Sequence, residues 1–88
     1  MNPSAFTFKL TVPTDPNLAA LIAEMAGHAA DYANLKGAPA ESFVERARGA
    51  AAKALKAATG PSCLAVFAAA DGALSITIGA ETVSQPLS

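Results

Sequence analysis

The chain has 88 residues and a formal net charge of −1, so it has room for one domain and lacks the basic excess typical of nucleic-acid-binding proteins. Hydrophobic residues make up 52% of the chain, but 23 residues are alanine, so the core is thin and association with a second chain is favoured. A charged fraction of only 15% excludes an intrinsically disordered protein.

Cysteine usage and hydropathy indicate the compartment. The single cysteine, Cys63, can form neither an intrachain disulfide nor a thiolate metal cluster, which favours a reducing, cytoplasmic location. The first ten residues lack the basic start and apolar run of a signal peptide, and no segment reaches the roughly 18 to 20 apolar residues of a membrane span. We therefore expect neither a membrane nor a nucleic acid as a partner.

Strict alternation of apolar and polar residues predicts a strand over residues 5–12. A helix is predicted over residues 16–35, because Thr14 or Asp15 can cap its start and Pro16 fits the first turn. Its end is expected at Lys36-Gly37, and residues 37–39 are expected to form a tight connection. The apolar stripe predicted to be buried on this helix comprises Leu18, Leu21, Ile22, Met25, Ala29, Tyr32 and Ala33.

A second helix is predicted over residues 40–58, ending before Gly60-Pro61. Its buried stripe is expected to contain Phe43, Val44, Ala47, Ala50, Ala51, Ala54, Leu55 and Ala58. A hairpin is predicted over residues 62–79, because Asp71-Gly72 favours a two-residue type I′ turn. That turn pairs residues whose numbers sum to 143, and residues 80–88 are left as a C-terminal tail.

The register divides the hairpin into two faces. Cys63, Ala65, Phe67, Ala69, Leu74, Ile76, Ile78 and Ala80 are expected to face the helices. Leu64 and Val66 lie on the opposite face beside Ser75 and Thr77, where no further element of the chain is expected to cover them. The predicted fold is a single α+β domain of order β-α-α-β-β, a two-layer sandwich with two helices on one face of a small antiparallel or mixed sheet.

The sequence offers no assembled catalytic group. His28 lies at the edge of the first helical stripe without an orienting partner, so we interpret it as a boundary histidine rather than a general base. Cys63 is expected to be buried as a small hydrophobic residue rather than to act as a reactive thiol. Neither metal-ligand spacing nor a glycine-rich phosphate loop is present, so no catalytic, cofactor or metal site is predicted.

Two sets of residues are candidates for protein contacts. Arg46, Gly49, Lys53 and Lys56 recur at helical spacing and are predicted to form an exposed ridge, either a contact for an acidic partner or a solvated face. Gly49 costs about 1 kcal/mol relative to alanine within a helix, so it could mark a close approach. Leu64, Val66 and Thr77 are the predicted self-association face, which would make the chain a dimer or larger.

Three segments, residues 8–18, 43–58 and 63–78, resemble the opening strand and first helix, the second helix and the hairpin of the GHKL, or histidine-kinase-like, ATPases. Within that family the chain is most similar to the small anti-sigma-factor serine kinases of bacteria. Gly49 and Lys53 stand where the family has a glutamate and a magnesium-binding asparagine. Residues 79–84 lack the family's Asp-x-Gly-x-Gly turn, and we expect no ATP lid. The resemblance therefore implies a degenerate, shortened relative that has lost ATP binding.

These observations favour a small non-catalytic regulatory or adaptor module that binds a protein partner, in the manner of an anti-sigma factor, and needs no cofactor. The alternative is a nucleotide-binding serine or histidine kinase-like ATPase with an unusual site. A third interpretation is a structural subunit that only oligomerises.

Overall fold

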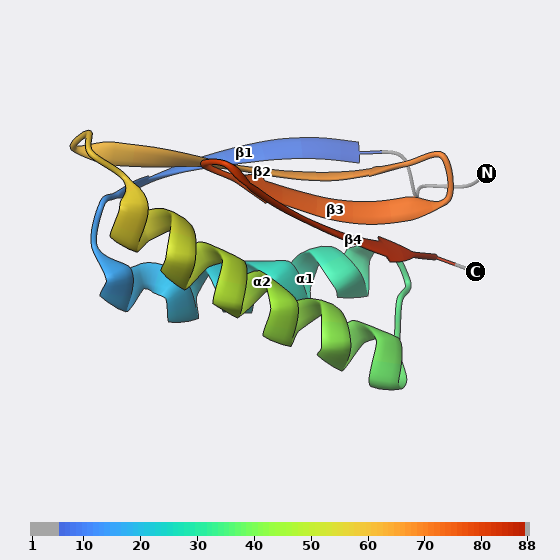
Figure 1. The fold of residues 1–88 in the computed structure, drawn as a ribbon. Helices are drawn as coiled ribbons and strands as arrows, with labels where there is room; N and C mark the ends of the chain where they lie inside the picture. The colour runs from blue at the N-terminus through green and yellow to red at the C-terminus, as the bar shows by residue number, and fades with distance from the viewer. Residues whose placement is uncertain (1–5, 88) are drawn as a thin grey trace.

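The computed structural model describes residues 6–87, which form two layers: a four-stranded sheet and a pair of helices packed on one of its faces (Figure 1). The elements in chain order are β1 (Phe6–Pro13), the 3₁₀ turn η1 (Pro16–Leu18), α1 (Ala19–Tyr32), α2 (Gly37–Ala57), β2 (Ser62–Ala70), β3 (Ala73–Ile78) and β4 (Glu81–Pro86). The sheet is antiparallel throughout, in the order β1-β2-β3-β4. The predicted α+β sandwich is confirmed, with β4 as an additional strand. Ala5 and Ser88, included in the predicted strand and tail, lie outside the described residues.

The first helical segment begins at Pro16 as predicted, but the connection between the two helices comes earlier in the chain than predicted. Asp15 caps η1, because its Oδ1 accepts the N–H of Asn17 at 3.0 Å, and α1 follows directly. The helix ends at Tyr32 rather than at residue 35, since Asn34 adopts a left-handed conformation with φ of 65°. The connection is therefore at residues 33–36, and residues 37–39, predicted to be the loop, form the first turn of α2 instead.

The predicted buried face of α1 is partly wrong. Leu21 and Tyr32 are exposed, with 40% and 63% of their surface accessible. Small side chains take the inner positions of α1, and a Cβ added at Gly27 would make an ordinary van der Waals contact with Val44 Cγ2 on α2, at 3.7 Å. The alanines fill the buried positions of α1, which leaves Leu21 and Tyr32 on the outside. The buried residues of α1 are Ala19, Ile22, Ala23, Ala26, Ala29 and Ala30.

The predicted stripe of α2 is correct for five of its eight residues, and Val44, Ala50 and Ala58 are half-buried. Its buried members are Phe43, Ala47, Ala51, Ala54 and Leu55. The largest fully buried side chains of the described residues are Ile22, Phe43, Leu55, Phe67, Leu74, Ile76 and Ile78, drawn from both layers. Cys63 is also buried, as expected.

The hairpin register is confirmed from Ala70↔Ala73 to Ala65↔Ile78, and every pair sums to 143. Asp71 and Gly72 have φ of 55° and 78°, as a type I′ turn requires. The two further pairs expected at residues 64/79 and 63/80 are absent from this ladder. The reason is that Gly79 (φ 59°) and Ala80 turn the chain into β4.

Candidate functional site

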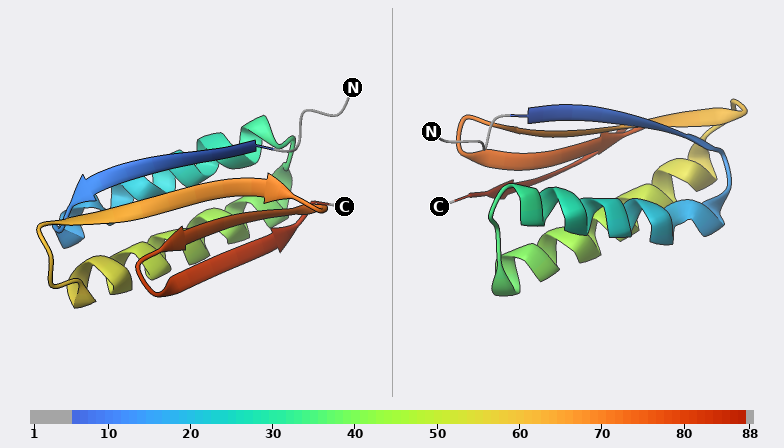
Figure 2. Two further views of the ribbon diagram at one scale, coloured as in Figure 1. Left: turned by 90° about the horizontal axis from the view of Figure 1, so that it is seen from above. Right: turned by 180° about the vertical axis from the view of Figure 1, so that it is seen from behind.

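One face of the sheet is covered by no other described element, as the view from above shows (Figure 2, left). The cross-strand pairs place on this open face Thr7, Lys9 and Thr11 of β1, Leu64, Val66 and Ala68 of β2, Ser75 and Thr77 of β3, and Thr82 and Ser84 of β4. Lys9 is the only charged side chain among these residues. The three residues predicted to form a self-association face therefore do share one surface.

The apolar centre of the open face is on β2. Val66 lies between Lys9 on β1 and Thr77 on β3 and is half-buried, whereas Leu64 is 45% exposed. The hydroxyls of Thr77 and Thr82 are 3.4 Å apart, so they can satisfy each other's hydrogen bonding. This surface can pack against a flat partner with one charge to desolvate, that of Lys9, and its remaining polar groups are hydroxyls.

The predicted ridge on α2 is exposed, but its members have different environments. The guanidinium of Arg46 donates to the carbonyl oxygen of Ser84 at 3.0 Å and to Oε1 of Gln85, so it holds β4 against α2. Gly49 marks no close approach, because a Cβ added there would meet nothing within 4 Å. Lys53 is exposed farther along the helix.

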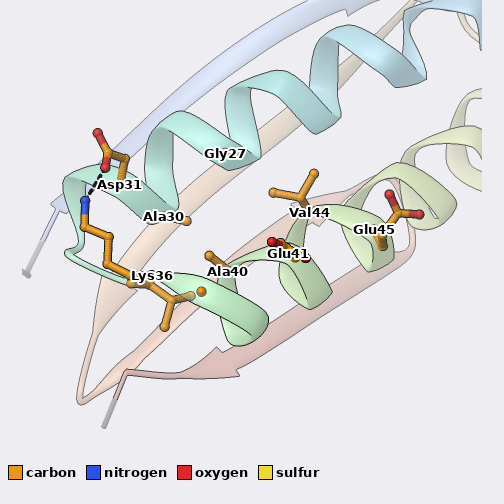
Figure 3. Close-up of a pocket in the computed structure, with 10 residues that line it drawn as sticks. Gly27, Ala30, Asp31, Lys36, Ala40, Glu41, Val44 and Glu45 are labelled. Atoms are coloured by element: carbon orange, nitrogen blue, oxygen red, sulfur yellow. Dashed lines mark hydrogen bonds and ion pairs between the residues drawn. The ribbon is translucent and has the colours of Figure 1, made fainter.

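A pocket of about 460 Å³ lies between the end of α1 and the start of α2 (Figure 3). Its lining includes the carboxylates of Asp31, Glu41 and Glu45 and the ammonium of Lys36. Lys36 Nζ donates to Asp31 Oδ1 at 2.6 Å, and this hydrogen bond and the lysine charge lower the pKa of Asp31 below its ordinary 3.8. The acidic excess disfavours a nucleotide phosphate in this pocket. The sequence analysis missed the pocket, although the i, i+4 spacing of the two glutamates places them on one side of α2.

Within residues 6–87, no group of three or more histidine, cysteine, aspartate or glutamate side chains could hold a metal ion. His28 is exposed on α1, where it lines a hollow beside β1. No helix in the described part of the chain is both long enough and apolar enough to span a membrane. Comparison with family models, curated proteins and solved structures finds no match for this chain.

Proposed function

We propose that this protein is a small non-catalytic regulatory or adaptor module that binds a second protein through the open face of its sheet. The composition of that face supports the proposal most directly. Ten side chains from four strands carry a single charge, that of Lys9, and their apolar centre contains the exposed Leu64. Seven of these ten side chains are polar, as on an ordinary exposed sheet face, but the face is depleted of charge in the way that the centres of protein interfaces are.

The expected partner presents a flat surface of low charge. Burying Val66 and Leu64 gains about 25 cal/mol per Å² of apolar surface, and the surrounding threonine and serine hydroxyls can exchange water for partner hydrogen bonds. Lys9 lies at the β1 side of the face, where it can stay hydrated and select against a basic partner.

The proposal includes the family resemblance. In a shortened histidine-kinase-like domain that has lost ATP, binding of an anti-sigma type would remain as the function. Lys53 supports the loss of nucleotide, because an ammonium in place of a metal-binding asparagine would repel magnesium. The carboxylates of Glu41 and Glu45 are a further electrostatic obstacle to a triphosphate.

Quantitative affinity capture from a lysate of the source organism tests the surface. The immobilised wild-type chain is compared with Leu64→Glu/Val66→Glu and with the matched ridge variant Lys53→Glu/Lys56→Glu. We expect a protein retained by the wild type and the ridge variant but lost from the sheet-face variant. Loss from the ridge variant alone would move the binding site to α2 and contradict the proposal. Retention by both variants would contradict it as well.

Thermal unfolding with Mg-ATP tests the rival enzymatic function. A ligand at 100 times its dissociation constant adds about 2.7 kcal/mol to the free energy of unfolding. We expect no rise in melting temperature with Mg-ATP. A rise of several degrees would favour the nucleotide-binding alternative.

A further inference from the structure

The two edges of the sheet differ in how their backbone groups are protected. The N–H of Leu87 donates inward to the carbonyl of Gly72 at 2.8 Å. Because inward and outward backbone groups alternate along an antiparallel strand, the backbone groups of Thr82, Ser84 and Pro86 on β4 point away from β3. Pro86 has no N–H, and Arg46 occupies the carbonyl of Ser84. This edge therefore lacks part of the donor and acceptor row that a further strand would need.

The β1 edge is less protected, because only its last residue, Pro13, lacks an N–H and has its carbonyl occupied, by the N–H of Asp15 at 2.8 Å. The N–H of Thr14 donates to the carbonyl of Pro61 at 3.2 Å. Because hydrogen-bonded residues alternate along an antiparallel strand, this bond shows that the even-numbered residues of β1 make the backbone hydrogen bonds to β2. The N–H and C=O groups of Thr7, Lys9 and Thr11 consequently point away from the sheet. No turn, loop or side-chain hydrogen bond among the described residues uses them.

α1 lies on the same side of the molecule as this free edge (Figure 2, left), and it carries a series of large side chains. Leu21, Met25, His28 and Tyr32 follow a 4-3-4 spacing, which places them on one side of the helix. These four residues, here named the α1 strip, include two of the three large hydrophobic side chains that are exposed in the described chain. On this side of the molecule the sheet therefore ends in free backbone groups, and the helical layer ends in exposed large side chains.

Aromatic side chains bridge the α1 strip and β1. Phe6 contacts Tyr32 edge-to-face with ring centroids 5.1 Å apart, and it stacks on Phe8 at 6.1 Å. Between these elements lies a hollow of about 360 Å³, lined mainly by Phe6, Phe8, Ala29 and Tyr32. The two phenylalanines are only half-buried, so part of their apolar surface remains open to a partner.

We propose that a second copy of this chain occupies this surface, related by a two-fold axis perpendicular to the sheet. Antiparallel pairing of β1 with β1 would continue the sheet, and packing of α1 on α1 would continue the helical layer. Because only the odd-numbered residues of β1 have outward backbone groups, the hydrogen-bonded pairs between the two copies must join odd-numbered residues. Pairing Thr7 with Lys9 of the second copy centres the axis at Phe8 and avoids placing the two Lys9 side chains directly opposite each other.

The size of the contact is that of a weak dimer. In this register residues 6–10 of the two β1 strands lie opposite each other, which is about 16 Å at roughly 3.3 Å per residue, and the 14 residues of α1 span about 21 Å. With a depth of about 10 Å for each layer, each copy contributes a footprint of about 370 Å² before side-chain relief is added. Two copies give about 700 Å², the size of a weak, reversible contact, so we expect association at high micromolar concentration.

Sedimentation analysis of the full chain at high micromolar concentration tests the dimer and its surface. Lys9→Pro removes an outward N–H without breaking the ladder to β2, and Tyr32→Glu puts a charge on the α1 strip while leaving the backbone unchanged. Matched controls are Thr82→Pro on the β4 edge and Leu64→Glu on the open face. We expect a wild-type dimer, a dissociation constant raised about tenfold or more by each test variant, and dimers in both controls.

A wild-type monomer, or a dimer that persists in Tyr32→Glu, would overturn the inference. The inference would also be overturned if Leu64→Glu dissociated the dimer and Tyr32→Glu did not. That result would assign self-association to the open face. If Lys9→Pro fails to fold by circular dichroism, Tyr32→Glu decides the question. The Lys9 amide of the wild type should also exchange more slowly at high than at low protein concentration. The proposed function is tested on a different surface, so either proposal can fail alone.

Discussion

Truncation of Phe67 should remove much of the stability of this domain. The side chain is fully buried on β2, directly opposite Phe8 and Ile76, and its ring stacks on that of Phe8 with centroids 4.7 Å apart. A buried aromatic side chain removes roughly 150 to 250 Å² from water, worth about 4 to 6 kcal/mol at 25 cal/mol per Å². Measured truncations of buried phenylalanine cost about 3 to 5 kcal/mol. At about 0.05 to 0.15 kcal/mol per residue, this chain has roughly 4 to 13 kcal/mol in total.

Urea unfolding followed by circular dichroism measures the loss for Phe67→Ala, at one fixed protein concentration because association would add to the apparent stability. Phe8→Ala is the matched comparison, since Phe8 is the other ring of the same stacked pair but is only half-buried. We expect the Phe8 variant to lose about half as much free energy of unfolding. A Phe67 variant that is as stable as the Phe8 variant would refute the assignment of this face of the hairpin to the core.

Three further substitutions test single contacts. Arg46→Met should lower the free energy of unfolding by about 1 kcal/mol and speed amide exchange in β4, whereas Arg48→Met should do neither; equal effects would show that β4 does not depend on the guanidinium. Lys36→Met should return the pKa of Asp31 towards 3.8 in an NMR titration. Because the paired carboxylate has the lower pKa, its stabilising effect exists above about pH 3.8 and disappears as the pH falls through the folded-state pKa; an unchanged titration would exclude the pair in solution. Gly49→Ala should raise stability by about 0.5 to 1 kcal/mol in thermal unfolding, and a loss would indicate a contact at this position.

The parts of the fold with strong local signals could be predicted from the sequence. Asp71-Gly72 determines a turn of two residues, and the register of β2 with β3 follows from the length of that turn. The predicted face of α2 was correct because its buried alanines alternate with charged residues such as Glu45 and Lys53, so only one side can be buried.

Weaker signals explain two of the errors, the buried face of α1 and the missed strand β4. In α1 the alanines are spread around much of the helix, so hydropathy favoured Leu21 and Tyr32, whereas close packing on α2 selected the small residues. In β4 only Val83 provides a large apolar side chain, and Pro86 is unfavourable within a strand except at an edge. The protection of the β4 edge could not be predicted for a similar reason, because it depends on a contact between Arg46 and Ser84 across 38 positions of sequence.

The clamp of Arg46 on β4 limits how far any assembly of this chain can extend. A sheet with two free edges can add strands at both ends and so grow into a filament. If the chain dimerises through β1 as proposed, Ser84 and Pro86 leave β4 unsuited to pairing, so one pairing event uses the available edge and the complex is finite and closed. Loss of the arginine would free the carbonyl of Ser84 for pairing and leave the missing N–H of Pro86 as the remaining barrier to growth at the second edge.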